Sequence, residues 1–121
     1  MIRIRRAYDP PGAEDGERIL VDRLWPRGTT KVSARLSAWL RDIAPTAELR
    51  RWFGHDPSRW EEFRRRYANE LRRPEQHAIL KDLAERSLRG VVTLVFAAKD
   101  ENRNNAVVLK ERIEEIAKRG E

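Results

Sequence analysis

The sequence predicts an α/β fold: a single small domain with an open, mostly parallel sheet of three to four strands flanked by helices. Residues 18–28 and 91–100 each hold an apolar run that ends in charged residues, as strands buried on both faces do. Segments with helical periodicity lie between and after these runs, which is typical of a parallel sheet. With 121 residues the chain has room for one core, so we expect residues 1–121 to form one domain.

The first part of the chain is expected to supply two strands and two loops. Ile2 and Ile4 alternate with arginines, which predicts a strand near a sheet edge with one solvated face. Residues 8–17 are rich in Pro, Gly and acidic side chains and predict a surface loop. A strand over residues 19–25 follows. In the next loop, Gly28 allows a positive φ or a close approach of the backbone to a ligand.

Helices are expected in most of the remaining chain. Apolar residues at helical spacing favour a helix over residues 36–43, although this segment is short enough to be a strand. Thr46 can cap a short helix that ends at Gly54, and Asp56 followed by proline is a helix start signal for residues 57–71.

The last part of the chain predicts a helix, a strand and a second helix. Residues 74–89 have an apolar stripe that includes Leu88, and Gly90 ends this helix. A strand over residues 91–98 comes next. Asn104 or Asn105 then caps a terminal helix that runs to residue 119.

Composition excludes several classes of protein. Cysteine is absent, which excludes disulfides, thiolate nucleophiles and every metal site that depends on Cys. With only two histidines a transition-metal site is disfavoured, and we expect no metal and no cofactor, although a magnesium site made by Asp9, Asp22, Asp100 or Glu101 stays open. No apolar run is long enough for a membrane span or a secretory leader, so we expect no membrane partner and a cytoplasmic protein.

The charge balance points to an anionic partner. The formal net charge is +6, and 21 of the 26 basic residues are arginines, which grip phosphate and carboxylate in a planar, bidentate manner. The 20 acidic residues are interspersed among them, so genome composition or thermal adaptation explains the same excess equally well.

Charged residues follow both predicted core strands, where open α/β sheets bind ligands. After the later strand, Lys99 and the amino terminus of the last helix favour an anion, with Asp100, Asn104 and Asn105 beside them. The alternative is that Asn104 only caps the helix and Asp100 only accepts backbone N–H groups.

Asp22 and Arg23 lie within the earlier apolar run, so at least one of them should be buried or nearly buried. Such a charge is either paired structurally or is a site residue with a perturbed pKa. His55 lies on a turn, where it is either a general acid or base or packs on a tryptophan. Trp25, beside Pro26 and Arg27, is open to base stacking or to a place in the core.

Several segments resemble the domain-of-unknown-function family 488, in its short YeaO-like branch. They include RILVDRLWPRG at 18–28, WLRDIAP at 39–45, LRRWFGHDP at 49–57 and AAKD at 97–100. The resemblance spans nearly the whole chain and implies a small bacterial or archaeal α/β protein without a settled activity. The chain departs from the family pattern at Arg103, where the family often has His, and at Thr46, where it usually has Ser.

The first functional hypothesis is binding of a phosphate-bearing ligand, a nucleotide or nucleic acid, at the strand carboxyl ends. Arg23, Arg27 and Lys99 would hold the anion, with Gly28, Asn104 and Asn105 as further binding residues. Catalysis is left open, with Asp22, Asp100 and His55 as candidate catalytic residues. One alternative is a non-catalytic nucleic-acid-binding module that uses arginine faces at residues 3, 5, 6 and 64–66, and another is a structural or protein-interaction domain.

Overall fold

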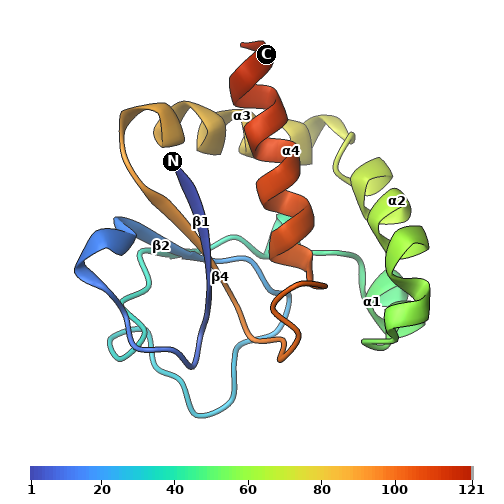
Figure 1. Cartoon of the computed structure of the whole chain (residues 1–121), viewed down its shortest axis with the longest axis horizontal. Helices are drawn as coiled ribbons and strands as arrows, with labels where there is room; N and C mark the ends of the chain where they lie inside the picture. The colour runs from blue at the N-terminus through green and yellow to red at the C-terminus, as the bar shows by residue number, and fades with distance from the viewer. Residues whose placement is uncertain (121) are drawn as a thin grey trace.

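The computed structural model describes residues 1–120, and its sheet has the strand order β1-β4-β2-β3 with every pair parallel. The strands are β1 (Ile2–Arg6), β2 (Glu17–Leu20), β3 (Ala38–Trp39) and β4 (Val92–Phe96). The predicted α/β class and the predicted edge position of the first strand are therefore confirmed. The strands run in one direction, so their carboxyl ends and the loops that follow them gather at one end of the sheet (Figure 1).

Four α-helices connect and follow the strands: α1 (Ala47–Phe53), α2 (Trp60–Glu70), α3 (Pro74–Arg89) and α4 (Asn105–Arg119). Short 3-10 turns lie at Ala13–Asp15, Arg41–Ile43 and Pro57–Arg59. The predicted caps of two helices are confirmed: the Thr46 side chain accepts a hydrogen bond from the Leu49 N–H, and Asn104 accepts one from Val107. Helices α1, α3 and α4 begin and end where these capping residues and the glycines at 54 and 90 predict. The helix predicted over residues 57–71 begins instead as the 3-10 turn Pro57–Arg59, which Asp56 caps, and continues as α2.

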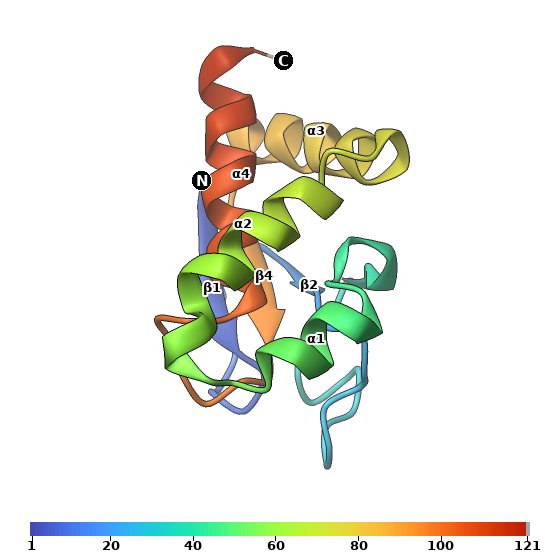
Figure 2. The same cartoon turned by 90° about the vertical axis from the view of Figure 1, so that its right-hand side faces the viewer.

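The sheet has a thick and a thin covering layer. Alternate strand residues such as Ile19, Leu94 and Phe96 pack with the apolar stripes of all four helices in the main core. Residues on the opposite face, Leu20 and Val95, pack only with a small cluster from the loops at 7, 34 and 36. Figure 2 shows α1 and α2 in front of the strands, α3 across the top of the molecule and the loop that follows β2 at the bottom. Period-two alternation thus assigns each strand residue to one of two unequal cores.

Two predicted elements are wrong. The strand expected over residues 19–25 ends at Leu20, although the Val21 N–H still donates to the Val95 carbonyl at 3.1 Å. Residues 36–43 form no helix, because Ala38 and Trp39 pair with Ile19 and Leu20 as strand β3. The apolar spacing of residues 36–43 is compatible with a helix and with a strand, and the pairing with the distant strand β2 decides between the two.

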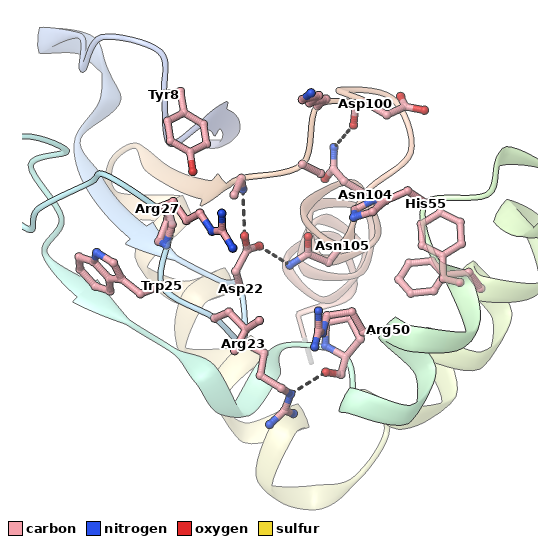
Figure 3. A pocket seen from close by; sticks show the side chains of 18 residues that line it. Tyr8, Asp22, Arg23, Trp25, Arg27, Arg50, His55, Asp100, Asn104 and Asn105 are labelled. Carbon is pink, nitrogen blue, oxygen red and sulfur yellow. Dashed lines mark hydrogen bonds between the residues drawn. The ribbon is translucent and has the colours of Figure 1, made fainter.

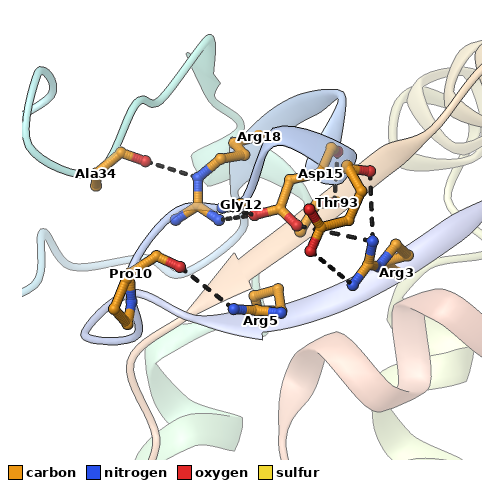
Figure 4. A network of polar contacts seen from close by, with 9 residues as sticks. Arg3, Arg5, Pro10, Gly12, Asp15, Arg18, Ala34 and Thr93 are labelled. Carbon is orange, nitrogen blue, oxygen red and sulfur yellow. Dashed lines mark hydrogen bonds and ion pairs between the residues drawn. The ribbon is translucent and has the colours of Figure 1, made fainter.

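The sequence predicts a buried charge at Asp22 or Arg23, but the fully buried charged pair is Asp15 and Arg18. Arg18 donates to the Asp15 carboxylate at 2.6 Å and, through Nε, to the Ala34 carbonyl at 2.7 Å, with both side chains almost wholly buried. The Thr93 hydroxyl donates to the Asp15 carbonyl at 2.6 Å (Figure 4). Asp22 and Arg23 are instead half-buried. The thin layer on this face of the sheet is therefore held by a polar network as well as by apolar contacts.

None of the helices formed by residues 1–120 is long and apolar enough to cross a bilayer.

Candidate functional site

A pocket of about 630 Å³ opens at the carboxyl ends of the strands. Its lining includes Tyr8, which follows β1, Asp22, which follows β2, and Ala97, which follows β4. Helix α1 adds Phe53 to the lining, and it contributes Arg50 from the other side (Figure 3). A volume of this size suits a small organic ligand.

The chain topology explains why a pocket forms between β2 and β4. After β2 the chain moves to β3 at one sheet edge, whereas after β4 it moves to α4, which packs on β1 toward the other edge. The two connections leave in opposite directions, so no element fills the space above the adjacent strand ends. This is the kind of crevice in which open α/β sheets bind ligands.

Asp22 ties the two strand ends to the start of α4. Its Oδ2 accepts the Ala97 N–H at 2.9 Å, and its Oδ1 accepts the Asn105 Nδ2 at 3.1 Å. Asn105 Nδ2 also donates to the Val21 carbonyl at 3.0 Å. Burial raises the pKa of the Asp22 carboxyl, and these two hydrogen bonds and the nearby charges of His55 and Arg50 only partly oppose the rise.

Four cationic side chains line the same pocket: Arg23, Arg27, Arg50 and Lys99. None of the four forms an ion pair with a carboxylate within residues 1–120. Arg23 Nε donates to the Pro45 carbonyl at 3.0 Å, which fixes the direction of its guanidinium group. The other three are exposed to solvent. Asp22 and Asp100 line the pocket as well, but neither is in direct ion-pair contact with these four cations.

Asp100, the second acid of the lining, is engaged in its own turn. Its Oδ1 accepts the N–H groups of Asn102 at 2.9 Å and Arg103 at 3.1 Å, and the Arg103 guanidinium donates to Oδ2 at 3.3 Å. The hydrogen bond from Asn102, together with those from Arg103, lowers the pKa of the Asp100 carboxyl. Asn104 is only 2% exposed, caps α4, and donates its amide to the Asp100 carbonyl at 2.9 Å. These groups shape the loop that carries Lys99.

His55 faces the pocket from the turn between α1 and the next helix. Its φ is 56°, in the left-handed region that is uncommon for residues other than glycine, and it follows Gly54 with φ of 54°. Its ring centroid lies 6.1 Å from that of Phe53, which in turn stacks on Phe63 at 4.3 Å. The imidazole therefore has an aromatic neighbour and is otherwise exposed.

The structure brings most predicted site residues together. Asp22, Arg23, Arg27, His55, Lys99, Asp100, Asn104 and Asn105 all line the pocket. Gly28 does not, and its φ of 70° serves the loop beyond Arg27. Trp25 lines the pocket and is partly exposed, so it is not a core residue.

Sequence reasoning missed Arg50 and Tyr8. Arg50 lies three residues before Phe53, so both point from the same face of α1 toward the pocket. That spacing was available in the sequence, but only the position of α1 beside the strand ends makes it meaningful. Tyr8 follows the edge strand and gave no local signal.

The arginines outside the pocket are mostly engaged. Arg64 pairs with Glu61 and Glu111, and Arg65 and Arg66 both pair with Glu62. Arg3 pairs with acids of the loop after β1, and Arg5 and Arg6 donate to backbone carbonyls. These contacts leave the predicted arginine faces with fewer free donors than their sequence indicates. Within residues 1–120 no group of three or more His, Cys, Asp or Glu side chains is arranged to hold a metal ion.

Comparison with known proteins identifies the family. The family model DUF488-N3i, described as the inactive DUF488-N3 subclade, matches residues 1–121. The chain belongs to this family. The resemblance seen in the sequence motifs is thereby confirmed.

Two relatives illustrate how similar the family members are. The uncharacterized protein Rv3073c of Mycobacterium tuberculosis (strain ATCC 25618 / H37Rv) is 42% identical over 108 residues, which cover 89% of this chain and 89% of the relative. The uncharacterized protein YeaO of Escherichia coli (strain K12) is also 42% identical over 108 residues, 89% of this chain and 92% of the relative. No solved structure matches the chain.

Proposed function

We propose that this protein binds a phosphate-bearing ligand without covalent chemistry in the pocket at the strand carboxyl ends. The observation that carries the proposal is the convergence of four cations without acidic partners on one pocket. Arginine and lysine donors in such a hollow are the groups that proteins use to hold phosphate. Arg23, Arg27, Arg50 and Lys99 supply the binding groups.

The hydrogen bonds of the candidate acids and bases favour ligand binding over catalysis. Both oxygens of Asp22 accept protein hydrogen bonds, and Asp100 is occupied by the backbone of its own turn. A carboxylate oxygen has more than one lone pair, so these contacts do not block proton transfer, but they commit both carboxylates to holding the strand ends and the turn in place. The family description, with its word inactive, supports the same choice.

The test is calorimetric titration with inorganic phosphate and pyrophosphate, using variants matched by position. Arg50→Ala removes a pocket cation, and Arg51→Ala removes the next residue of the same helix, which is exposed and does not line the pocket. Loss of one charge-assisted contact should weaken pyrophosphate binding about tenfold, or about 1.4 kcal/mol, in Arg50→Ala. Arg51→Ala should remain within about twofold of the parent chain.

Lys99→Ala and Lys81→Ala provide a second matched pair, since Lys81 is exposed on α3 away from the pocket. If both variants of each pair lost the same affinity for pyrophosphate, the effect would come from net charge alone, and this result would contradict the proposal. Absence of phosphate and pyrophosphate binding by the parent chain would contradict it as well.

A further inference from the structure

Exposed apolar side chains gather at the same pocket. Among residues 1–120 the large apolar side chains that remain exposed are Met1, Tyr8, Leu24, Trp25, Val32 and Leu88, and three of these, at positions 8, 24 and 25, line it. Tyr8 is 48% exposed, Leu24 57% and Trp25 37%. Exposed apolar side chains beside a cationic pocket indicate a binding site for a ligand that has both an apolar part and an anionic part.

The Tyr8 ring is held in place from behind. The Arg6 guanidinium lies over it, 5.2 Å from the ring centroid. Arg6 is itself fixed, because its Nε donates to the Ala98 carbonyl at 2.9 Å and another guanidinium nitrogen donates to Ala97 at 3.2 Å. The Tyr8 hydroxyl points into the pocket (Figure 3). A ring that is already oriented loses little entropy when a ligand stacks on it.

Trp25 is held on the neighbouring loop. Its indole Nε1 donates to the Thr29 carbonyl at 2.5 Å, and its ring meets Trp39 edge to face, with the centroids 5.2 Å apart. More than a third of the residue stays exposed despite these two contacts. Tyr8 and Trp25 thus lie on one flank of the pocket, with Trp25 at its outer edge beyond Arg27, and Arg27 and Arg50 point toward its interior (Figure 3).

We propose that the ligand is a free nucleotide whose base packs on Tyr8 and Trp25 while its phosphate contacts the pocket cations. The inference rests on the proposed function and adds the class of ligand. Aromatic side chains stack on any base, and arginines bind the phosphate, so the two halves of the lining match the two halves of a nucleotide. A free nucleotide fits better than a nucleic-acid strand, because the arginines of α2 beyond the pocket are paired with glutamates.

The experiment compares AMP with ribose 5-phosphate by calorimetry on the full chain. The two probes share the phosphate and the sugar, so the ratio of their dissociation constants isolates the base. AMP should bind at least about tenfold more tightly. In Tyr8→Ala and in Trp25→Ala this ratio should fall below about threefold, while the affinity for ribose 5-phosphate stays within about twofold.

Conservative and distant variants keep the test specific. Tyr8→Phe and Trp25→Phe retain an aromatic face and should retain most of the AMP advantage. Leu88→Ala removes an exposed apolar side chain of α3, which is 72% exposed and outside the pocket, and should change neither affinity.

Three results would overturn the inference. AMP and ribose 5-phosphate could bind equally, or the AMP advantage could survive in both alanine variants. A 5′-phosphorylated oligothymidylate could bind more tightly than dTMP with a steep salt dependence, which would assign the surface to nucleic acid. In each of these cases, phosphate binding that depends on Arg50 would still support the proposed function. If no probe bound, including inorganic phosphate, both the nucleotide inference and the proposed function would be refuted.

Discussion

Asp22 is expected to stabilise the fold, and Asp22→Ala tests this directly. The substitution removes the acceptor at 2.9 Å from the Ala97 N–H and the acceptor at 3.1 Å from Asn105. Asn105 keeps the Val21 carbonyl at 3.0 Å, so its loss is small. The Ala97 N–H loses its partner at a half-buried position, which costs about 1–3 kcal/mol. We expect a loss of about 2 kcal/mol in the free energy of unfolding, or about 8 °C in Tm.

Asp22→Asn should cost less at neutral pH and more in acid. The amide oxygen can still accept the Ala97 N–H, and the substitution removes a charge that is disfavoured by burial. The pKa of the Asp22 carboxyl is raised in the folded chain, so the folded state binds this proton more tightly than the unfolded state does. Protonation therefore favours folding as pH falls through the folded pKa, and the stability it supplies is lost again as pH rises. The asparagine variant lacks this gain, so its deficit grows as pH falls.

Urea denaturation followed by tryptophan fluorescence, at about pH 7 and about pH 4.5, measures both effects. Carboxyls with lowered pKa, such as Asp15 and Asp100, change the stability of every variant alike, so the difference from the parent chain isolates Asp22. Asp42→Ala, at an exposed position outside the pocket, is the control. If Asp22→Ala lies within about 0.5 kcal/mol of the parent chain, the bridging role is refuted, and if the asparagine deficit shrinks in acid, the raised pKa of Asp22 is refuted.

Three further predictions concern charge and backbone. Asp22→Asn should strengthen phosphate binding severalfold by calorimetry, because it removes a negative charge from the pocket, and a loss of binding would instead indicate a direct role for the carboxylate. Arg18→Met should lower the free energy of unfolding by about 3 kcal/mol, because it leaves the buried Asp15 carboxylate with only the longer 3.9 Å ion pair to Arg3. Arg86→Met at an exposed pair should cost less than about 1 kcal/mol in the same urea titration. Gly16→Ala should prevent stable folding, because a Cβ at this position would lie 2.2 Å from the Val91 carbonyl oxygen and the backbone φ is 61°. The expected result is loss of cooperative thermal unfolding, whereas an ordinary unfolding transition would show that this turn can rearrange.

The helices were predictable because their ends carry local chemical signals. Pro74 and Gly90 bound α3 within one residue of its expected limits, and Asn104 caps α4 through a hydrogen bond three residues along the chain. Periodicity was less reliable for single positions: Leu88 fits the apolar stripe of α3 but is 72% exposed. The last turn of α3 still faces the core, but through Ser87, so that Leu88 lies on its solvent side.

The misassigned segments depend on contacts that no local pattern contains. Ala38 and Trp39 form a strand because β2 offers an open edge to them, and the Leu40 N–H continues the pairing to the Leu20 carbonyl at 2.9 Å. The same holds for charge burial. Arg18 lies on the face of β2 that also carries Leu20, so the 3-10 turn at Ala13–Asp15 can bring Asp15 against it. The expectation of a buried charge was sound, but its position depended on the folding of the preceding loop.

The candidate site was predictable to the extent that it follows from strand direction. Parallel strands put Asp22 and Lys99 at one end of the sheet, and the observed pocket includes both. Helix α1, however, reaches this end only through its packing on α2, and with it come Arg50 and the neighbouring His55. The sequence shows that such residues exist, whereas only tertiary packing shows which of them face the pocket.

The distribution of charge in the pocket connects fold and function. The two acids are used by the protein itself, since Asp22 joins strand ends and Asp100 shapes a turn and pairs with Arg103, and neither forms an ion pair with the four pocket cations. Cations gathered without such partners repel one another, at a cost that falls with solvent exposure. A bound anion relieves that repulsion and adds hydrogen bonds. A reaction that used the exposed imidazole of His55 would rely on a ring that packs near Phe53 and has no side-chain hydrogen-bond partner within residues 1–120. Under the proposed function, this arrangement therefore favours ligand binding over catalysis.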